Sequence, residues 1–493
     1  MPPVTPVRRL STWNAFTALS GGLILLSACA SVPASHTLTP LAPESVASSQ
    51  SLAGDSGAWP QKAWWHGFND PQLDGLMSEA LANSPDVLAA QARLEKAQAV
   101  EAQVKAAMDA DLTLNASTQE TKSSLNMGTP DQVPGFSGFS PKDLLPHGYW
   151  NLTRISLDAN YDLDLWGKSH AALKASLGAR QAAELDATVA QNELTAELAR
   201  AYVELNRLYD QRDDLADLKR GADIKIDLDQ ARFDHHVDPK DVLLGAQDEQ
   251  QQIIGRLAAI DNLIKLQGDE IAALVGAGPD RALTLTQPKL APVDAESLPA
   301  DVRLNLLARR PDVQAAMQRV EAQGEGLKYA KADYYPNLKL NAFFGLQALS
   351  KGGFNSLFDE GSDIGGFGPA ISLPLFHQGR LNAEYKGYEA DYDSAVATYD
   401  KTLLGALQQV ADAASKAQAN ATELTAAQAR VDAAQQGYEL SKARFGKGLA
   451  SKIDVLTAHS RLIAMQSAQS DLKAQAYADH ISFIAALGGG YSQ

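Results

Sequence analysis

The chain has 493 residues, enough for two or three domains of ordinary size with buried cores. It carries 43 basic and 59 acidic side chains, which gives a formal net charge of −16 at pH 7. Such an acidic balance argues against a nucleic-acid partner, because nucleic acids bind to basic surfaces. The composition is rich in Ala, Gln, Leu and Asp and only 7% aromatic, which favours long helices.

The N-terminus has the pattern of a bacterial export signal. Arg8 and Arg9 precede an apolar stretch at residues 15–28 that is too short to span a bilayer. The tetrapeptide "LSAC" that ends at Cys29 resembles a lipobox, in which the chain is cut before the cysteine and the sulfur is lipidated. We therefore expect residues 1–28 to be a lipoprotein signal peptide. The covalent lipid on Cys29 is the only cofactor that the sequence suggests, and an ordinary signal peptide with a chance cysteine is the alternative.

One stretch of sequence, called here the recurring phrase, occurs twice in the mature chain. "ANSPDVLAAQARLEKAQ" starts at Ala82 and "ARRPDVQAAMQRVEAQG" starts at Ala308, an offset of 226 residues. The Pro-Asp-Val triplet keeps this offset, and so does the arginine that follows it, Arg93 in the first copy and Arg319 in the second. The sequence therefore contains an internal repeat of about 200 residues.

Both copies predict the same order of elements. A helix over residues 73–109 leads into the alternating stretch "LTLNAS", and a helix over 300–333 leads into "NLKLNAFFGLQ", both of which read as strands. Loops rich in Gly, Pro and Ser follow at 121–147 and 348–367. Each loop returns through a second strand, "NLTRISLDANYDLDLWG" or "FGPAISLPLFHQG".

A long helix follows each predicted pair of strands. From Lys168 to about Arg232 there is no proline, and apolar residues recur at alternating steps of three and four, as they do in the second copy. This period near 3.5 is typical of coiled coils. About 65 residues at 1.5 Å each make a rod about 100 Å long. Tight turns, "ARFDHHVDPKDVL" and "ARFGKGLASKIDVL", precede return helices over 241–275 and 453–487.

Two strands from each copy make four strands per chain. Four strands cannot close a barrel, for which about eight is the practical minimum. The chain must therefore associate with copies of itself, and spacing alone does not choose between two copies and three. Beyond the signal peptide, no window offers the roughly 20 apolar residues of a transmembrane helix. We expect six segments along the chain. They are a signal peptide (1–28), a lipid-anchored segment that wraps the middle of the molecule, its equatorial region (29–72), a first repeat (73–275), a connector (276–299), a second repeat (300–487) and a tail (488–493).

The repeated pattern resembles the TolC-like outer-membrane efflux factors, in particular the lipoprotein (NodT-type) branch that serves resistance-nodulation-division pumps. The most specific stretch is "LPADVRLNLLARRPDVQAAMQRVEAQGEGLKYAKADYYPNLKL" from Leu298. The hairpin "RFGKGLASKIDVL" and the C-terminal "ALGGGY" are also similar to the family.

This resemblance implies a homotrimer in the bacterial outer membrane. The expected fold is mainly α with some β: three chains would form a 12-stranded transmembrane β-barrel and a long coiled-coil helical tunnel that projects into the periplasm. The implied partners are a periplasmic adaptor protein, an inner-membrane pump and outer-membrane lipid. The resemblance also implies that the turns at the tips of the helical hairpins contact the adaptor. These turns hold His235, His236, Val237, Lys447, Gly448 and Leu449.

The first of these turns departs from the second. His235-His236-Val237 stands where the second tip has the glycine-bearing Lys447-Gly448-Leu449. Adjacent histidines point in different directions and lack further ligands at metal spacing, so a solvated turn is the simpler interpretation of the pair than a metal site.

Acidic residues are dense near the tips. Asp432 and Glu439 lie one heptad apart on the second long helix. The resemblance implies that some carboxylates face the lumen, where threefold symmetry forms rings that narrow a closed entrance. A solvated coiled-coil surface is the alternative for any one of them.

The sequence contains no motif of nucleophilic, metallohydrolase or nucleotide-binding enzymes. We expect a passive exit duct of a tripartite efflux system that exports small toxic compounds, and not an enzyme. Two alternatives are the outer component of a type I protein-secretion system and a structural periplasmic coiled-coil lipoprotein. The strands and long loops argue against the second, since a structural rod does not need them.

Overall fold

The computed structural model describes residues 32–48, 50–52, 57–122, 148–292, 297–299, 302–374 and 377–492. Cys29 and the predicted signal peptide lie outside these residues, as does most of the predicted loop 121–147. The chain divides into two compact units. Among the described residues, the sheet unit comprises those up to Leu38 and those within Gln98–Gly178 and Glu321–Ser394, and the helical unit comprises those within Thr39–Ala97 and Ala179–Val320 and those from Ala395 onward.

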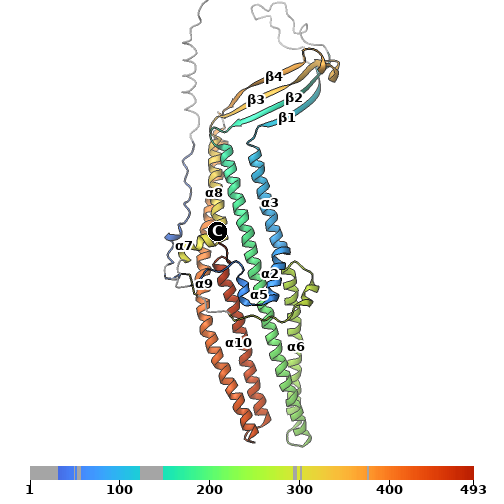
Figure 1. Ribbon diagram of the computed structural model, residues 1–493, viewed down its shortest axis with the longest axis vertical. Coiled ribbons are helices and arrows are strands. Elements are labelled where there is room, and N and C mark those ends of the chain that lie inside the picture. The colour runs from blue at the N-terminus through green and yellow to red at the C-terminus, as the bar shows by residue number, and fades with distance from the viewer. Residues whose placement is uncertain are drawn as a thin grey trace, which may run out of the picture. The chain divides into compact units, whose positions relative to one another are not determined.

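The described residues are mainly helical and include one four-stranded sheet, which confirms the predicted fold class (Figure 1). The two longest helices are those predicted after the strands, with 67 and 69 residues. The elements in chain order are η1 Pro43–Ser45, η2 Trp64–Phe68, α2 Pro71–Asn83, α3 Pro85–Ala106, β1 Asp111–Thr121, β2 Trp150–Leu163, α5 Lys168–Asp234, α6 Lys240–Leu274, η4 Pro279–Thr284, α7 Val302–Arg309, α8 Pro311–Ala332, β3 Asn337–Ser350, η5 Gly353–Phe358, β4 Asp363–Ser372, α9 Gln378–Gly446 and α10 Lys452–Ala486.

Each single helix predicted before a strand is in fact two helices. The breaks come at Ser84 and Arg310, and a proline, Pro85 or Pro311, begins the next helix in both copies. Proline has a fixed φ and no N–H, so it suits the first position of a helix and interrupts a continuing one. The recurring Pro-Asp-Val phrase therefore marks a helix start.

The strands also differ from their predicted limits. β4 begins at Asp363, inside the stretch predicted as a loop, and β3 continues to Ser350. The four strands are all antiparallel in the order β1-β2-β3-β4. Pairing with β3 extends β4 through a glycine-rich stretch that the sequence pattern favoured as loop.

The core of the helical unit forms where the segment before α2 meets the middle of α5. Trp64 and Phe68 are buried there with Tyr202, which is fully buried. Asp70 caps α2 by accepting from the Gln72 N–H at 2.9 Å, and it also accepts from the Tyr202 hydroxyl at 2.8 Å. Burial is the main cause that raises the pKa of Tyr202. The hydroxyl is therefore a fixed donor to Asp70 and ties the segment to α5.

The same close contact, of a glycine with a backbone carbonyl, occurs once in each repeat. Gly276, after α6, and Gly488, after α10, both have positive φ, +74° and +101°. A Cβ on Gly276 would lie 2.4 Å from the Asn83 carbonyl oxygen, and a Cβ on Gly488 would lie 1.9 Å from the Arg309 carbonyl oxygen. Asn83 and Arg309 occupy equivalent places in the repeat, one residue before each break. In each repeat, the glycine that follows the return helix therefore packs against the backbone carbonyl of the residue before the break.

We predict that Gly488→Ala destabilises the protein by about 2–4 kcal/mol, because a side chain there combines left-handed backbone strain with a clash against rigid backbone. The measurement is the apparent free energy of unfolding, followed by helical circular dichroism in denaturant. Gly437→Ala is the control, since nothing lies within 4 Å of a Cβ at this position within α9. It should stabilise by up to about 1 kcal/mol. Equal effects of the two substitutions would contradict the role assigned to Gly488.

Candidate functional site

One face of the sheet is apolar and exposed. In an antiparallel sheet, residues directly opposite each other share a face, and the register places Leu114, Leu157 and Phe344 in one such row. Their exposed fractions are 70%, 42% and 70%. Other exposed apolar side chains of this face are Leu112, Tyr161, Leu340, Phe367 and Ile371. An apolar patch of this extent suits contact with lipid or another apolar surface.

The opposite face of the sheet carries a polar network. Asp158 accepts from the Asn115 side-chain amide at 2.8 Å and from the Ser156 hydroxyl at 2.7 Å. Arg154 lies 3.5 Å from the same carboxylate and stacks on Phe343 at 5.2 Å. The sheet therefore has one face suited to hydrocarbon and one suited to water. Among the helices of the described residues, none has both the length and the apolar character that crossing a bilayer requires.

The turns predicted as tips have the same backbone geometry. In the first, the His236 N–H donates to the Phe233 carbonyl and the Val237 N–H donates to the Arg232 carbonyl, at 2.9 and 2.8 Å. In the second, Gly448 and Leu449 make the matching bonds at 2.9 Å each, to the Phe445 and Arg444 carbonyls respectively. Both are Schellman motifs that satisfy the last carbonyls of a long helix. The missing glycine of the first tip is thus replaced by His236, which adopts the left-handed conformation at φ +60°.

The two tips are stabilised differently beyond the turn. At the first, Arg232 binds both oxygens of Asp238, at 2.5 and 2.9 Å, and this hydrogen bonding lowers the pKa of Asp238. At the second, Ser451 and Asp454 form a capping box at the start of α10, and the Ser451 N–H lowers the pKa of Asp454. Both carboxylates therefore stay ionised well below neutral pH.

Each tip presents an exposed aliphatic side chain. Val237 is 60% exposed and Leu449 is 75% exposed. His235, His236 and Lys447 are exposed as well. The six predicted tip residues therefore make two small surfaces of similar backbone shape, each with an apolar centre.

The two predicted gate carboxylates lie on exposed positions of α9. Asp432 accepts from the Gln428 side-chain amide at 2.8 Å, and within the described residues no basic side chain pairs with it. Glu439 pairs with Lys442 at 3.3 Å, which offsets part of its charge. Both side chains are therefore accessible, and Asp432 carries the less compensated charge of the two.

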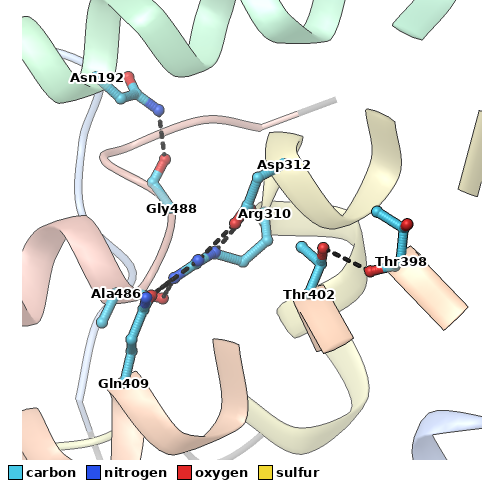
Figure 2. Close-up of polar contacts among 8 residues, drawn as sticks. All are labelled: Asn192, Arg310, Asp312, Thr398, Thr402, Gln409, Ala486 and Gly488. Carbon is cyan, nitrogen blue, oxygen red and sulfur yellow. Dashed lines mark hydrogen bonds and ion pairs between the residues drawn. The ribbon is translucent and has the colours of Figure 1, made fainter. Parts of the chain in front are cut away.

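A buried arginine holds the second break together, and we did not predict a role for it from the sequence. Figure 2 shows Arg310 reaching Asp312, Gln409 and the Ala486 carbonyl. Its bonds to the Asp312 carboxylate are 2.8 and 2.6 Å long, and those to the Gln409 and Ala486 oxygens are 2.9 Å. One guanidinium thus joins α8, α9 and the end of α10. The sequence contains one sign of this role. The first repeat has Ser84 at the place equivalent to Arg310, so the two copies differ at this position.

A cavity of about 990 Å³ adjoins Arg310 within the helical unit. Negative side chains outnumber positive ones in its lining. Burial raises the pKa of Glu193, and the neighbouring charges of Asp312 and Glu197 raise it further. The charged lining residues are Glu193, Glu197, Glu204, Glu270, Asp312, Asp412, Arg200, Arg310 and Lys416. The cavity therefore favours cations over anions.

Solved outer-membrane proteins share this fold. The outer membrane protein VceC of Vibrio cholerae matches with a TM-score of 0.78 and 34% identity, over 88% of this chain and 100% of VceC. The outer-membrane channel OprN matches with a TM-score of 0.77 and 25% identity, over 94% of this chain and 99% of OprN. The two-faced sheet and long helical hairpins thus define the class of outer-membrane channel subunits.

The chain belongs to the outer membrane efflux protein family, which it matches over residues 76–276 and 303–489. It is 29% identical to the multidrug resistance outer membrane protein MdtP of Escherichia coli O6:H1 over 483 residues, 96% of each chain. It is also 30% identical to the fusaric acid resistance protein FusA of Burkholderia cepacia over 391 residues, 73% of this chain and 66% of FusA.

We predict that Arg310→Ala destabilises the protein by about 2–4 kcal/mol, because it leaves the Gln409 and Ala486 oxygens without their donor and Asp312 without its cation. The measurement is the apparent free energy of unfolding in denaturant. Arg319→Ala is the matched control, since Arg319 pairs with Asp186 where both side chains are about half exposed. It should cost less than about 1 kcal/mol. A loss for Arg310→Ala no larger than this would contradict the role of Arg310.

We predict that His236→Gly stabilises the first tip by about 1 kcal/mol, because glycine adopts the left-handed conformation without a Cβ clash. Amide hydrogen exchange of residues 232–240 should then slow by about fivefold. Gly448→Ala at the second tip should speed exchange there by a similar factor. Faster exchange in His236→Gly would show that the histidine side chain holds the turn through contacts that outweigh its backbone strain.

Proposed function

We propose that this protein is a passive outer-membrane exit duct of a tripartite efflux system, and that it exports small toxic compounds delivered by an inner-membrane pump. The single observation that carries this proposal is the two-faced sheet, with Leu114, Phe344 and Phe367 exposed on one face and the Arg154–Asp158 network on the other. A surface in contact with lipid outside and with water inside requires this division. A periplasmic structural rod has no use for it.

The proposed assembly is a homotrimer. Within the described residues, β1 pairs only with β2 and β4 pairs only with β3, so each chain offers two free strand edges. Unpaired backbone groups are costly in hydrocarbon, so neighbouring chains are expected to join β1 to β4. Three copies would supply twelve strands, in keeping with the resemblance to trimeric efflux factors.

The proposed anchor is a lipid on Cys29 in the outer membrane. Support comes from the lipobox-like "LSAC" and from Val32, which packs at the hydrophobic cluster formed by Tyr334, Leu381 and Tyr385. Cys29 is three residues from Val32, and extended chain covers at most about 3.6 Å per residue. A lipid on Cys29 would therefore start within about 11 Å of Val32.

The proposed partners are a periplasmic adaptor at the two tips and an inner-membrane pump of the resistance-nodulation-division type. Val237 and Leu449 supply exposed apolar centres for adaptor contact, and the Schellman bonds give both tips one backbone shape. Similar tips from each of three chains would present six nearly equivalent contacts. The relatives MdtP and FusA bear names of resistance proteins, which supports toxic small molecules as the cargo.

The proposed lumen prefers cations. The acidic excess around the cavity next to Arg310 and the net charge of −16 both support this preference. Asp432 and Glu439 are proposed to face the closed entrance, where three copies of each would form carboxylate rings.

Single-channel conductance of the lipidated protein in a planar bilayer tests the proposal. We predict a small, cation-preferring conductance from a trimer. Asp432→Asn with Glu439→Gln should raise it by about twofold or more and reduce the cation preference, because both changes remove charge that binds cations and narrows the entrance.

Asp248→Asn with Asp269→Asn is the matched control, since it removes two exposed carboxylates from α6. It should leave the conductance unchanged. A folded trimer that never conducts would overturn the channel proposal. Equal conductance changes from the two variant pairs would overturn only the gate assignment.

A further inference from the structure

A basic groove lies in the sheet unit where β2 leads into α5 and α8 leads into β3. Its volume is about 460 Å³. Trp166 and Tyr335 form one wall, with their rings stacked at a centroid distance of 4.7 Å, and the Trp166 ring N–H donates to the Pro336 carbonyl at 2.8 Å. Trp166 nevertheless remains 51% exposed. The wall is therefore a fixed aromatic surface open to its surroundings.

The charge of the groove is positive. Lys174, Lys328 and Lys331 line it, and Glu325 is its only carboxylate among the described residues. Glu325 bonds Lys328 at 2.8 Å, whereas Lys174 and Lys331 are exposed and make no ion pair within the described residues. The lining thus carries a net charge of two positives in a chain that is strongly acidic as a whole.

The lysines that α8 gives to the groove lie on a different stripe of this helix from the α8 residue nearest the polar face of the sheet. A neighbouring cavity of about 380 Å³ takes Asp162 and Lys339 from that polar face, with Tyr329 of α8 and Asp333 directly after this helix. The groove shares Trp166, Ala332 and Tyr335 with that cavity and adds Lys328 and Lys331 of α8. Successive helix residues differ by about 100° in direction, so the two stripes of α8 point to different sides.

The groove is also next to exposed apolar side chains. Leu165, which is 60% exposed, lies between Trp166 and the end of β2. Exposed tryptophan and tyrosine next to an apolar surface are typical of the boundary between hydrocarbon and water. Free lysines at that boundary attract anionic headgroups.

We infer that this groove binds the phosphate headgroup of an anionic phospholipid, with Lys174, Lys328 and Lys331 holding the phosphate and the Trp166–Tyr335 pair packing beside the acyl chains. This inference rests on the proposed insertion in the outer membrane. The fit is one of charge, since three lysines line a groove whose aromatic wall at Trp166 follows directly on the exposed Leu165. A bound headgroup would fix the depth of the sheet in the bilayer.

The test is native mass spectrometry of the detergent-purified, lipidated oligomer titrated with dioctanoyl phosphatidylglycerol or dioctanoyl phosphatidylcholine. The wild type should bind the glycerol lipid at least about 10-fold more tightly, and the triple variant Lys174→Gln, Lys328→Gln and Lys331→Gln should lose this preference by about 10- to 100-fold. The matched control replaces Lys96, Lys240 and Lys401, three exposed lysines of the helical unit, by glutamine. It should keep the preference.

Three results would overturn the inference. The first is equal binding of the two lipids, or equal loss in both triple variants. In the second, inorganic phosphate at the same concentration displaces the lipid, which would make the groove a site for free anions. In the third, the triple variant lowers the oligomer mass, which would make the groove a contact between copies of this chain. Conductance of the same preparation tests the channel proposal separately, since a conducting trimer without lipid preference removes only this inference.

Discussion

The arrangement of this protein depends on a constraint on its sheet: four strands with two different faces and two free edges cannot exist alone in either water or lipid. Leu114 and Phe344 are exposed on one face of the sheet, which therefore requires apolar surroundings. Asp158 and its hydrogen-bond donors lie on the other face, which requires water. β1 and β4 each leave an edge without a partner in the described chain. Only association with further copies satisfies both demands, and the resemblance to trimeric efflux factors sets the expected number of copies at three.

The internal repeat explains how one chain supplies two similar hairpins to such an assembly. In both halves a proline starts the helix before the first strand, and a glycine with positive φ ends the return helix on the preceding carbonyl. The halves are nevertheless not equivalent. Arg310 replaces Ser84 and bonds three elements, so the second half gains a rigid junction that the first half does not share.

Acidic and basic side chains also gather on different surfaces of the protein. Acidic side chains outnumber basic ones around the cavity next to Arg310, and Asp432 and Glu439 are exposed on α9, where a cation path is proposed. Unpaired lysines gather beside Trp166, where the sheet unit is proposed to meet anionic lipid. A net charge of −16 disfavours contact with an anionic membrane surface, and the basic groove is proposed to offset this repulsion locally.

The sequence by itself determined the repeat, the long helices, the strands and the family, because helix and strand periods and turn residues act over a few neighbouring positions. It also located both tips, although it did not show that His236 could take the backbone conformation of Gly448. Tertiary structure alone decided where β4 begins, since a glycine-rich stretch becomes a strand only when β3 supplies its hydrogen bonds. It alone revealed the role of Arg310, whose acceptors Gln409 and Ala486 lie 99 and 176 residues away in the chain. The basic groove also required the fold, because Lys174 and Lys331 line the same groove only when α5 and α8 pack together.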